Sequence, residues 1–576
     1  MNAILELIEN NLWDEALKQF IYHTENKKPT DSYCIIGTTI MEHYGKYDSM
    51  FEFIRGGLKL NPYNYELYLL LGNYYSTRNK IQAYLSYENA LYHCINSGID
   101  EDRNTLEQLL KNTDISSLVF AKRVSFVILS YNTLDYTKAC IESIRTTCYS
   151  QCYEIIVIDN ASNDGSVEWL SEQQDIILIK NSENVGFPAG CNQGINAANA
   201  DNDIFLLNND TILLPNSLFW LRIGLYNGEN VGATGAVTNY AANGQIVGGH
   251  YDTVEDYIHF GTGINVPDVN PYEEKTFLVM FAMLIKRKCL NMVGLLDELY
   301  TPGNFEDNDY GLRIMQNSYK CILCHNSYIY HFGSRSFGKN IRHYTDIYYT
   351  NREKFKNKWG FYDDYYTHAR LDVISLINFK SSDEFSVLEV GCGLGETLAK
   401  IKYNFPNASV SGIEIVDNIA SLGNNRFDII SGDIETMSLN KKYDIILFPD
   451  VLEHLRYPEN ILVSVKNNLK TNGYIISSIP NLMNASIIYG LLHGFFTYQD
   501  AGILDNTHLR FFTLHEIYGM FDRAGYEISH VEASVSPKES TDSYKDFFNQ
   551  LLSINGMAPK EQFDAYQYLV RATPKS

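Results

Sequence analysis

The sequence predicts a multidomain chain in which an all-α helical repeat is followed by two α/β domains. Three observations predict this order. Related segments recur at even intervals near the N-terminus, short apolar runs alternate with helical segments from Val124, and a second such alternation begins near Ser386. The chain has 576 residues, which is too many for one core, since domains usually hold roughly 100–150 residues. We predict the three parts at residues 1–118, 119–362 and 363–576.

The composition excludes several classes of protein. The net charge is −23, from 46 Lys and Arg against 69 Asp and Glu, so the chain lacks the basic character that nucleic-acid binding requires. The acidic N-terminal segment lacks the basic start of a signal peptide, and the longest apolar runs fall short of the ~20 residues of a membrane helix. We therefore expect a cytoplasmic protein with no membrane span, whose 10 scattered cysteines stay reduced.

The N-terminal repeat is carried by three segments with evenly spaced starts, Asn11–Ala16, Gly45–Met50 and Asn79–Tyr84. With the third copy slipped by one residue, the pattern resembles the tetratricopeptide repeat, whose period is about 34 residues and whose stacked helix pairs leave a groove. An ordinary helical bundle is the alternative. A module of this kind either binds a protein partner or packs on its own catalytic domain.

Polar residues follow the predicted strands of the first α/β part. The strands are predicted at Val124–Leu129, Glu154–Ile158, Ile176–Lys180 and Ile204–Leu207, in a mostly parallel sheet. Ligands of such sheets bind beyond the carboxyl ends of the strands. A carboxylate there, such as Asp210, can hold a divalent cation that also contacts a diphosphate.

Seven motifs of this part, in this order, resemble a family 2 glycosyltransferase of the GT-A fold, in the branch that includes bacterial rhamnosyltransferase-like enzymes. They are VSFVILSYN, VIDNASNDGS, NSENVGFPAGCNQGI, LLNNDT, VGLLDE, FEDNDYGLR and YHFGSRSF, between about Val124 and Trp359. The resemblance implies inverting transfer of a sugar of the hexosyl or rhamnosyl type from a UDP- or dTDP-sugar. The acceptor would be a glycan or glycoprotein, and Mn²⁺ or Mg²⁺ would assist.

The resemblance also implies roles for single residues. Asp159 would contact the nucleoside, and Asp210 would bind the metal, with His331 completing the site unless it is a structural histidine. One carboxylate of Glu306 and Asp307 would be the catalytic base, and we expect Asp307. The remaining residues of the nucleotide-sugar site would be Ser130, Tyr131, Asn132, Asn184, Asn192, Asn208 and Asn209.

Three features of this part need separate interpretation. The family motif often has Asp where this chain has Asn208, which predicts weaker metal affinity or metal dependence but not inactivation. Asp309 and Arg313 lie one helical turn apart on a predicted helix, and either a surface ion pair or positioning of the acidic loop fits. The run Cys321–His325 spells the c-type haem attachment sequence, but its alternating pattern favours a strand that leads to His331.

The second α/β part begins with a strand and a glycine-rich turn, Val387–Gly395. This turn alone does not distinguish nicotinamide cofactors from S-adenosylmethionine, and a domain for another nucleotide is the alternative. The acidic strand ends that follow resemble a class I S-adenosylmethionine-dependent methyltransferase, over about Phe385–Val535. The segment His508–Thr513 is similar to one found in methyltransferases that accompany polysaccharide genes.

The methyltransferase resemblance implies a binding site for S-adenosylmethionine, with Glu389 and the glycines near the methionine, Glu414 on the ribose and Asp433 near the adenine. The complete set is Glu389, Gly391, Gly393, Gly395, Glu414, Asp433 and Asp450. Candidate bases for methyl transfer to a hydroxyl are His454 and His508, although each could be a structural histidine.

Together these patterns predict a bifunctional glycan-assembly enzyme that transfers a sugar and methylates a glycan. Two alternatives stay open. Only one of the catalytic domains could be active, with Asn208 putting sugar transfer in doubt first. The chain could also be a scaffold whose repeats recruit a partner and whose catalytic domains are relics.

Overall fold

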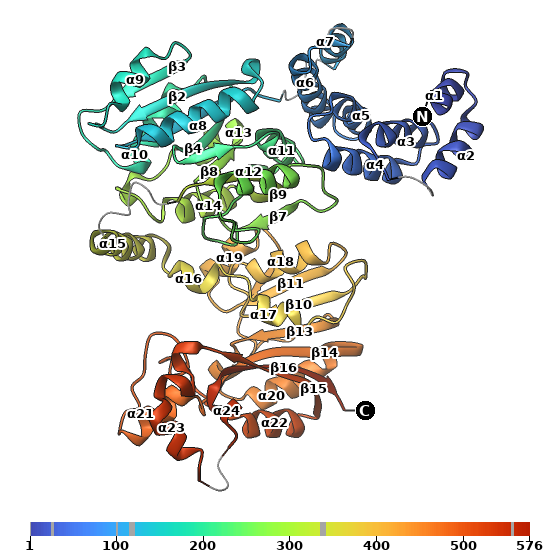
Figure 1. Cartoon of the computed structure of the whole chain (residues 1–576). Coiled ribbons are helices and arrows are strands. Elements are labelled where there is room, and N and C mark those ends of the chain that lie inside the picture. Colours follow the sequence, from blue (N-terminus) through green and yellow to red (C-terminus); the bar gives the residue numbers. More distant parts are fainter. Residues whose placement is uncertain are drawn as a thin grey trace. The chain divides into compact units, whose positions relative to one another are not determined.

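The computed structural model describes residues 2–24, 28–99, 102–113, 121–333, 341–554 and 558–575. The chain forms two compact units, Met1–Tyr362 and Asp363–Ser576, and each contains its own sheet (Figure 1). Among the described residues, no helix has both the length and the apolar character needed to cross a membrane.

The first unit begins with helices whose starts follow the sequence repeat. Helices α2 (Trp13–Thr24), α4 (Tyr47–Leu60) and α6 (Lys80–Asn96) begin at nearly even intervals, and they alternate with α3 (Asp31–His43), α5 (Tyr65–Ser76) and α7 (Arg103–Asn112) after the short α1 (Asn2–Glu9). Gly72 allows the close packing of α5 on α6, because a Cβ there would lie 2.2 Å from the Tyr87 ring. Their assignment as tetratricopeptide repeats stays a prediction.

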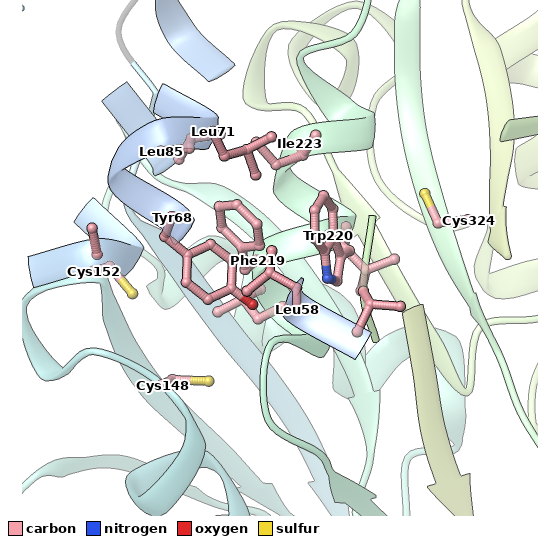
Figure 2. Close-up of a cluster of buried hydrophobic side chains, with 14 of the residues drawn as sticks. Leu58, Tyr68, Leu71, Leu85, Cys148, Cys152, Phe219, Trp220, Ile223 and Cys324 are labelled. Carbon is pink, nitrogen blue, oxygen red and sulfur yellow. The ribbon is translucent and has the colours of Figure 1, made fainter. Parts of the chain in front are cut away.

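These helices share a hydrophobic core with the α/β domain that follows them. The core continues from α5 and α6 into α11 (Ser217–Leu225), where the rings of Tyr68 and Phe219 meet edge to face with centroids 5.4 Å apart (Figure 2). A shared apolar core makes the two parts one folding unit. Of the two arrangements expected for the repeat region, packing on its own catalytic domain is therefore the one that the structure shows.

Polar contacts of α6 complete this interface. The Asn79 side chain donates to the Tyr226 carbonyl at 2.8 Å, and Gln82 donates to the Ile223 carbonyl at 3.0 Å. Arg222, whose side chain is 4% exposed, forms an ion pair with Glu88. A buried charge of this kind is stable only while its partner is present.

Removal of this partner is expected to destabilise the first unit. Glu88→Ala would leave the Arg222 guanidinium buried without its carboxylate and lower the free energy of unfolding by about 3–5 kcal/mol. The four tryptophans all lie within Met1–Tyr362, so urea denaturation followed by tryptophan fluorescence measures this unit alone. Glu107→Ala is the control, because its pair with Arg103 is exposed and is worth at most about 1 kcal/mol. Equal effects of the two substitutions would contradict the prediction.

The sheet of the first unit is mixed. Its strand order is β3-β2-β1-β4-β8-β6-β9-β5, with β7 also paired to β9. The strands are β1 (Val124–Ser130), β2 (Tyr153–Asp159), β3 (Ile176–Lys180), β4 (Asp203–Asn208), β5 (Thr211–Leu213), β6 (Val231–Val237), β7 (Tyr272–Lys275), β8 (Ala282–Ile285) and β9 (Lys320–His331). Strands β1 to β4 are parallel, whereas β8 runs antiparallel to both β4 and β6. Strands β6 and β9 also pair in parallel, whereas β5 and β7 run antiparallel to β9. The prediction of a mostly parallel sheet is therefore correct for the first four strands and for the β6–β9 pair, and wrong for β5, β7 and β8.

Helices connect and cover these strands. They are α8 (Leu134–Thr147), α9 (Ser166–Glu172), α10 (Phe187–Ala197), α11, α12 (Val254–Ile264), α13 (Arg287–Val293), α14 (Glu306–Gln316) and α15 (Ile341–Trp359). Helix α10 lies close to β1 because Gly190 and Gly194 face it, and a Cβ at either would lie within 2.5 Å of Leu129 or Val127.

The second unit has a doubly wound sheet of order β12-β11-β10-β13-β14-β16-β15. Its strands are β10 (Ser386–Val390), β11 (Ser409–Glu414), β12 (Asp428–Ser431), β13 (Tyr443–Pro449), β14 (Leu469–Pro480), β15 (Tyr526–Val535) and β16 (Ala565–Pro574). The first five strands of that order are parallel, and β16 pairs antiparallel with β14 and β15. Because β10 lies between β11 and β13, the strand order reverses there, which is where such sheets bind ligands.

The helices of this unit are α16 (Asp363–Tyr366), α17 (Leu371–Ser375), α18 (Glu396–Asn404), α19 (Asp417–Gly423), α20 (Pro458–Val465), α21 (Ala485–Leu492), α22 (Leu514–Arg523), α23 (Lys545–Leu551) and α24 (Lys560–Asp564). Helix α18 begins directly after the glycine-rich turn of β10, so the turn is held between a strand and a helix, as the sequence predicts.

Candidate functional sites

The first site is built at the carboxyl ends of β1, β2 and β4. Asp159 ends β2, is fully buried, and accepts the Ser162 N–H on Oδ1 at 2.8 Å. Its Oδ2 has no hydrogen-bond partner among the described residues. A buried carboxylate oxygen usually has a donor, so this atom is suited to a ligand N–H or O–H.

The loops after β1 and β2 are bound to each other. The Asn132 N–H donates to Ser162 Oγ at 2.9 Å, and Asn132 Oδ1 accepts the Asn163 N–H at 2.8 Å. Ser130 is buried, with Oγ 3.0 Å from a threonine hydroxyl of α8, whereas Tyr131 is 38% exposed. Tyr131 and Asn132 are thus the exposed residues of the predicted Ser130–Asn132 group, and the Asn132 side chain is partly engaged by the second loop.

Three other predicted residues use their side-chain amides within the protein. Asn184 accepts the Gly186 N–H at 2.9 Å before α10. Asn192 exchanges two 2.9 Å hydrogen bonds with the backbone of Leu296. Asn209 donates to two threonine hydroxyls near the start of α8, at 2.6 and 2.8 Å. These contacts position loops, and a direct role in nucleotide-sugar binding stays a prediction.

Asp210 and His331 lie side by side, as their assignment to one metal site requires. Strand β5 pairs antiparallel with the end of β9, which brings Asp210 Oδ1 to 3.2 Å from His331 Nε2. His331 Nδ1 lies 2.7 Å from the Tyr240 carbonyl, which can only accept, so Nδ1 carries the hydrogen. In the neutral ring Nε2 then presents a lone pair to the carboxylate. Two facing acceptors require a cation between or beside them, either a proton or a metal ion.

The structure also describes a ring that packs on His331 and the residue that ends β4 shortly before Asp210. The His331 ring stacks on Phe281 with centroids 5.1 Å apart and an interplanar angle of 14°. Asn208 ends β4, is half-buried, and accepts the Thr211 hydroxyl on its carbonyl at 2.7 Å. The predicted YHFGSRSF motif ends at residues 334–337, which lie outside the described residues.

The acidic pair opens helix α14. Glu306 is buried, and burial, followed by the charge of Asp307, raises its pKa to about 8. Its Oε2 has no hydrogen-bond partner in the part of the chain that the structure describes. Two adjacent carboxyls rarely ionise together in such a place, and here the proton resides on Glu306 at neutral pH. The half-buried Asp307 is then the better general base.

Asp309 is not part of a surface ion pair, and that alternative is wrong. It is fully buried and accepts from Arg313 Nε at 2.8 Å, from Trp359 Nε1 at 2.9 Å and from Lys358 Nζ at 2.5 Å. These contacts join α14 to the end of α15 and so fix the helix that carries the acidic pair. The sequence carried no signal for Lys358 or Trp359, because they belong to a separate helix much further along the chain.

The haem-like run lies within β9. Cys321 and Cys324 are buried, so their sulfurs are out of reach of a haem vinyl group, and His325 Nε2 lies 2.8 Å from Glu273 Oε2. The prediction of a strand here is confirmed.

The second site is centred on the glycine-rich turn after β10. Gly391, Gly393 and Gly395 have φ values of 72°, 54° and 83°, in the left-handed region that favours glycine. The Gly393 N–H donates to Glu414 Oε2 at 2.9 Å, and the Val416 N–H donates to Glu414 Oε1 at 3.0 Å. Glu414 therefore holds the turn, in addition to the role on a ribose that the resemblance implies.

Glu389 lies next to this turn on β10. It is 2% exposed, and burial raises its pKa to about 8. Its Oε2 is also without a hydrogen-bond partner among the described residues. A buried carboxyl at the reversal point of the sheet is suited to a ligand cation, such as the amine of a methionine group.

Asp433 and Asp450 differ in detail from the expectation. Strand β12 ends at Ser431, so Asp433 lies just beyond the strand end at which it was predicted, and it accepts the Glu435 N–H at 2.8 Å. Asp450 follows β13, accepts the Ser478 hydroxyl at 2.6 Å and forms an ion pair with Arg370. No sequence pattern indicated Arg370, because it lies on a distant segment before the first strand of this unit.

The two candidate bases come together. The rings of His454 and His508 lie with centroids 4.7 Å apart at 73°. Burial, followed by the neighbouring His508, lowers the pKa of His454. Beside them the structure adds Glu453, which the sequence did not single out and whose pKa burial raises well above its ordinary value.

In both units, buried carboxylates with unused oxygens lie at the carboxyl ends of parallel strands, where α/β sheets bind nucleotides. The fold and the two sites define a chain with two α/β domains, each of which has buried carboxylates near the carboxyl end of a parallel strand. Residues 125–284 match the model of the family described as Glycosyl transferase family 2, and residues 362–531 match the one described as Methyltransferase domain. The chain therefore carries a family 2 glycosyltransferase domain followed by a methyltransferase domain, and both predictions are confirmed.

Curated relatives match the second unit. The ubiquinone biosynthesis O-methyltransferase of Rickettsia canadensis is 27% identical over 165 residues, which cover 27% of this chain and 69% of the relative. The mitochondrial enzyme of the same description from Schizosaccharomyces pombe is 32% identical over 132 residues, covering 21% of this chain and 48% of the relative. The chain thus spans about half the length of the latter.

Solved structures resemble each unit more distantly. A structure of GalNAc-T7 with UDP, GalNAc and Mn²⁺ matches 39% of this chain and 47% of its own, at 14% identity and a TM-score of 0.31. A putative methyltransferase from Bacillus halodurans matches 36% of this chain and 98% of its own, at 14% identity and a TM-score of 0.25.

Proposed function

We propose that the chain is a bifunctional glycan-assembly enzyme. The first unit transfers a sugar of the hexosyl or rhamnosyl type from a UDP- or dTDP-sugar to a glycan or glycoprotein, with inversion. The second unit methylates a glycan with S-adenosylmethionine. One observation carries the proposal. The chain combines two transferase domains, and each has a site with a buried carboxylate oxygen that lacks a hydrogen-bond partner among the described residues.

In sugar transfer, the residues of the first site have separate roles. Asp159 accepts a hydrogen bond from the nucleoside on its unused Oδ2. Asp210 and His331 would hold Mn²⁺ or Mg²⁺, which would supply positive charge to stabilise the leaving diphosphate. The Tyr240 carbonyl keeps the hydrogen of His331 on Nδ1, so Nε2 is available as a ligand. Asp307 accepts the proton of the attacking hydroxyl.

For methyl transfer, the glycine turn and its carboxylates bind the donor. The turn lets the backbone approach the ligand, Glu414 and Asp433 contact the ribose and adenine, and Glu389 faces the methionine amine. His454 lies in the turn after β13, close in sequence to Val451, which contacts Gly391 of the donor turn, and the His508 ring packs on His454. The acceptor hydroxyl would be placed here for direct displacement.

Donor hydrolysis and ligand binding test both halves. Hydrolysis of UDP- and dTDP-sugars is expected only with Mn²⁺ or Mg²⁺ present, and S-adenosylmethionine binding is expected by calorimetry. Asp210→Asn should lower hydrolysis at least about 100-fold, whereas the exposed Asp201→Asn should not. No turnover of any donor, together with no binding of S-adenosylmethionine, would refute the proposal.

A second candidate is that only methyl transfer is active, which Asn208 favours because it removes a charge from the cation site. The two candidates differ in one measurement: mass spectrometry of the glycan made with and without the protein. Loss of a whole methylated sugar supports both activities, whereas loss of a methyl group alone supports the second. The cytoplasmic location and a protein partner for the helices stay predictions.

Glu389 gives the donor site a pH dependence. With a pKa of about 8 it is mostly protonated at pH 7, and a ligand cation favours the ionised form. Binding of S-adenosylmethionine should then release up to about one proton at pH 7. Below pH 8, the affinity should rise by up to about tenfold for each unit by which the pH increases. Calorimetry in buffers of different ionisation enthalpy measures the proton.

Glu389→Gln should abolish this proton release, while the exposed Glu384→Gln should keep it. The folded-state pKa of Glu389 lies above its ordinary value of 4.5, so its proton stabilises the fold fully below about pH 4.5. This contribution is lost as the pH rises from there to about 8, and Glu389→Gln lacks that loss. Unchanged proton release in Glu389→Gln would show that another group is the source.

A further inference from the structure

The methyltransferase unit contains a cluster of three side chains whose composition the donor site does not explain. Glu453 and His454 lie in the short 3₁₀ turn Leu452–His454 after β13, and His508 lies between α21 and α22. One carboxylate oxygen of Glu453 and one ring nitrogen of each histidine all lie within 4.8 Å of one another. We call these residues the Glu453 cluster.

The backbone holds the two segments of the cluster together. The Glu453 carbonyl accepts the N–H groups of Leu509 and Arg510 at 2.8 and 3.0 Å. These bonds fix the chain just after His508 against the turn that carries His454. The approach of the three side chains is therefore fixed by backbone hydrogen bonds and does not depend on exposed side chains alone.

The hydrogen-bonding state of both histidines follows from their neighbours. His454 Nδ1 lies 3.3 Å from the Thr507 carbonyl, and His508 Nδ1 lies 3.0 Å from the Ile503 carbonyl. The Thr507 hydroxyl also lies 3.2 Å from His454 Nδ1, but it donates its hydrogen to Asp505 Oδ1 at 2.5 Å and so accepts as well. Because both Nδ1 atoms face acceptors, each carries the hydrogen and each neutral ring keeps a lone pair on Nε2. Metal-binding histidines are commonly oriented in this way, by a backbone carbonyl on the other nitrogen.

Glu453 adds a third acceptor without a donor. Its side chain is fully buried, and neither carboxylate oxygen has a hydrogen-bond partner among the described residues. Buried carboxylates are normally paired or coordinate a metal. Two imidazole lone pairs and one carboxylate are all acceptors. A cation placed among them would satisfy all three.

We propose that the Glu453 cluster binds a zinc-class divalent cation through Glu453, His454 and His508. Two histidines and one glutamate are a ligand set of catalytic zinc sites, which keep a fourth position open, and imidazole ligands disfavour Mg²⁺ and Ca²⁺. His454 is only half-buried, so the open position is reachable from solvent. The two histidines then act as ligands and do not serve as the bases that the sequence predicted.

The place of the cluster indicates its use. Strand β13 pairs in parallel with β10, so the carboxyl ends that carry the cluster and the glycine turn lie at the same edge of the sheet. The cation would bind an acceptor hydroxyl beside the methyl donor. This role rests on the proposed methyl transfer, whereas the cation site itself does not.

Zinc binding by the full chain tests the proposal. The protein is stripped with a chelator, dialysed and titrated with Zn²⁺ by calorimetry, and Co²⁺ absorption is recorded in parallel. The wild type should bind one equivalent that a large excess of Mg²⁺ does not displace. His508→Gln, His454→Gln and Glu453→Gln should each lose this equivalent, and the exposed His515→Gln on α22 should retain it.

One further variant and one further measurement separate the possible outcomes. Asp210→Asn should retain the equivalent, which distinguishes it from a cation in the sugar-transfer site. Zn²⁺ should raise the melting temperature of the wild type but not that of Glu453→Gln, whose metal-free fold is checked by circular dichroism. Equal zinc binding by wild type and His508→Gln, or no zinc binding by the stripped wild type, would overturn the proposal. Failure of methyl transfer with intact zinc binding would instead count against the proposed function.

Discussion

Asp307→Asn is expected to lower the rate of sugar transfer by about 10²–10⁴-fold, the usual contribution of a general base. The reason is the division of charge in the pair at the start of α14. Burial keeps a proton on Glu306, so Asp307 is the group that can accept the hydroxyl proton. Transfer from a radiolabelled nucleotide sugar measures the loss, and methylation by the same protein should be unchanged.

Two matched variants make this result specific. Glu306→Gln resembles the protonated side chain in size and charge, so it should cost much less than Asp307→Asn. Asp268→Asn, on an exposed loop of the same unit, should have no effect. A larger loss in Glu306→Gln than in Asp307→Asn would reverse the assignment of the base.

Glu414→Gln is expected to weaken S-adenosylmethionine binding by about 10- to 100-fold, the equivalent of one lost buried hydrogen bond at a cost of about 1–3 kcal/mol. Both carboxylate oxygens accept backbone N–H groups, from Gly393 and Val416, and an amide nitrogen cannot accept. One buried N–H is therefore left unsatisfied, and the glycine turn loses its anchor.

Calorimetry of S-adenosylmethionine binding measures this effect, with Glu384→Gln as the exposed control on the same unit. Sugar transfer should persist in Glu414→Gln, since the first unit folds around its own core. Wild-type affinity in Glu414→Gln would mean that the turn is rigid without this side chain.

Residues next to strand ends were predictable because the pattern that marks a strand also marks where it stops. The strand pattern placed Asp210 just beyond β4 and Glu389 beside the glycine turn, whereas the assignment of His331 to the site of Asp210 came from the resemblance to family 2 glycosyltransferases. The direction of a strand in the sheet was harder to predict. Strand β8 is a short apolar run, and such a run has the same pattern in a parallel and an antiparallel strand, so its antiparallel pairing was not predicted.

Contacts between distant segments were not predictable, because they leave no periodic signal. Lys358 and Trp359 on Asp309, Arg370 on Asp450 and the approach of His508 to Glu453 all join segments that are far apart in the chain, and each depends on the finished fold. The same holds for the ion pair of Glu88 with Arg222.

That ion pair and the surrounding core change how the chain can be divided. The sequence pattern has three modules, but a cut between residues 118 and 119 would expose the faces of α6 and α11, including Phe219 and the Arg222 guanidinium. Neither fragment would keep its solubility or stability. The cut that yields two self-contained proteins lies between Tyr362 and Asp363, so any shortened version of the chain should keep the helices together with the glycosyltransferase domain.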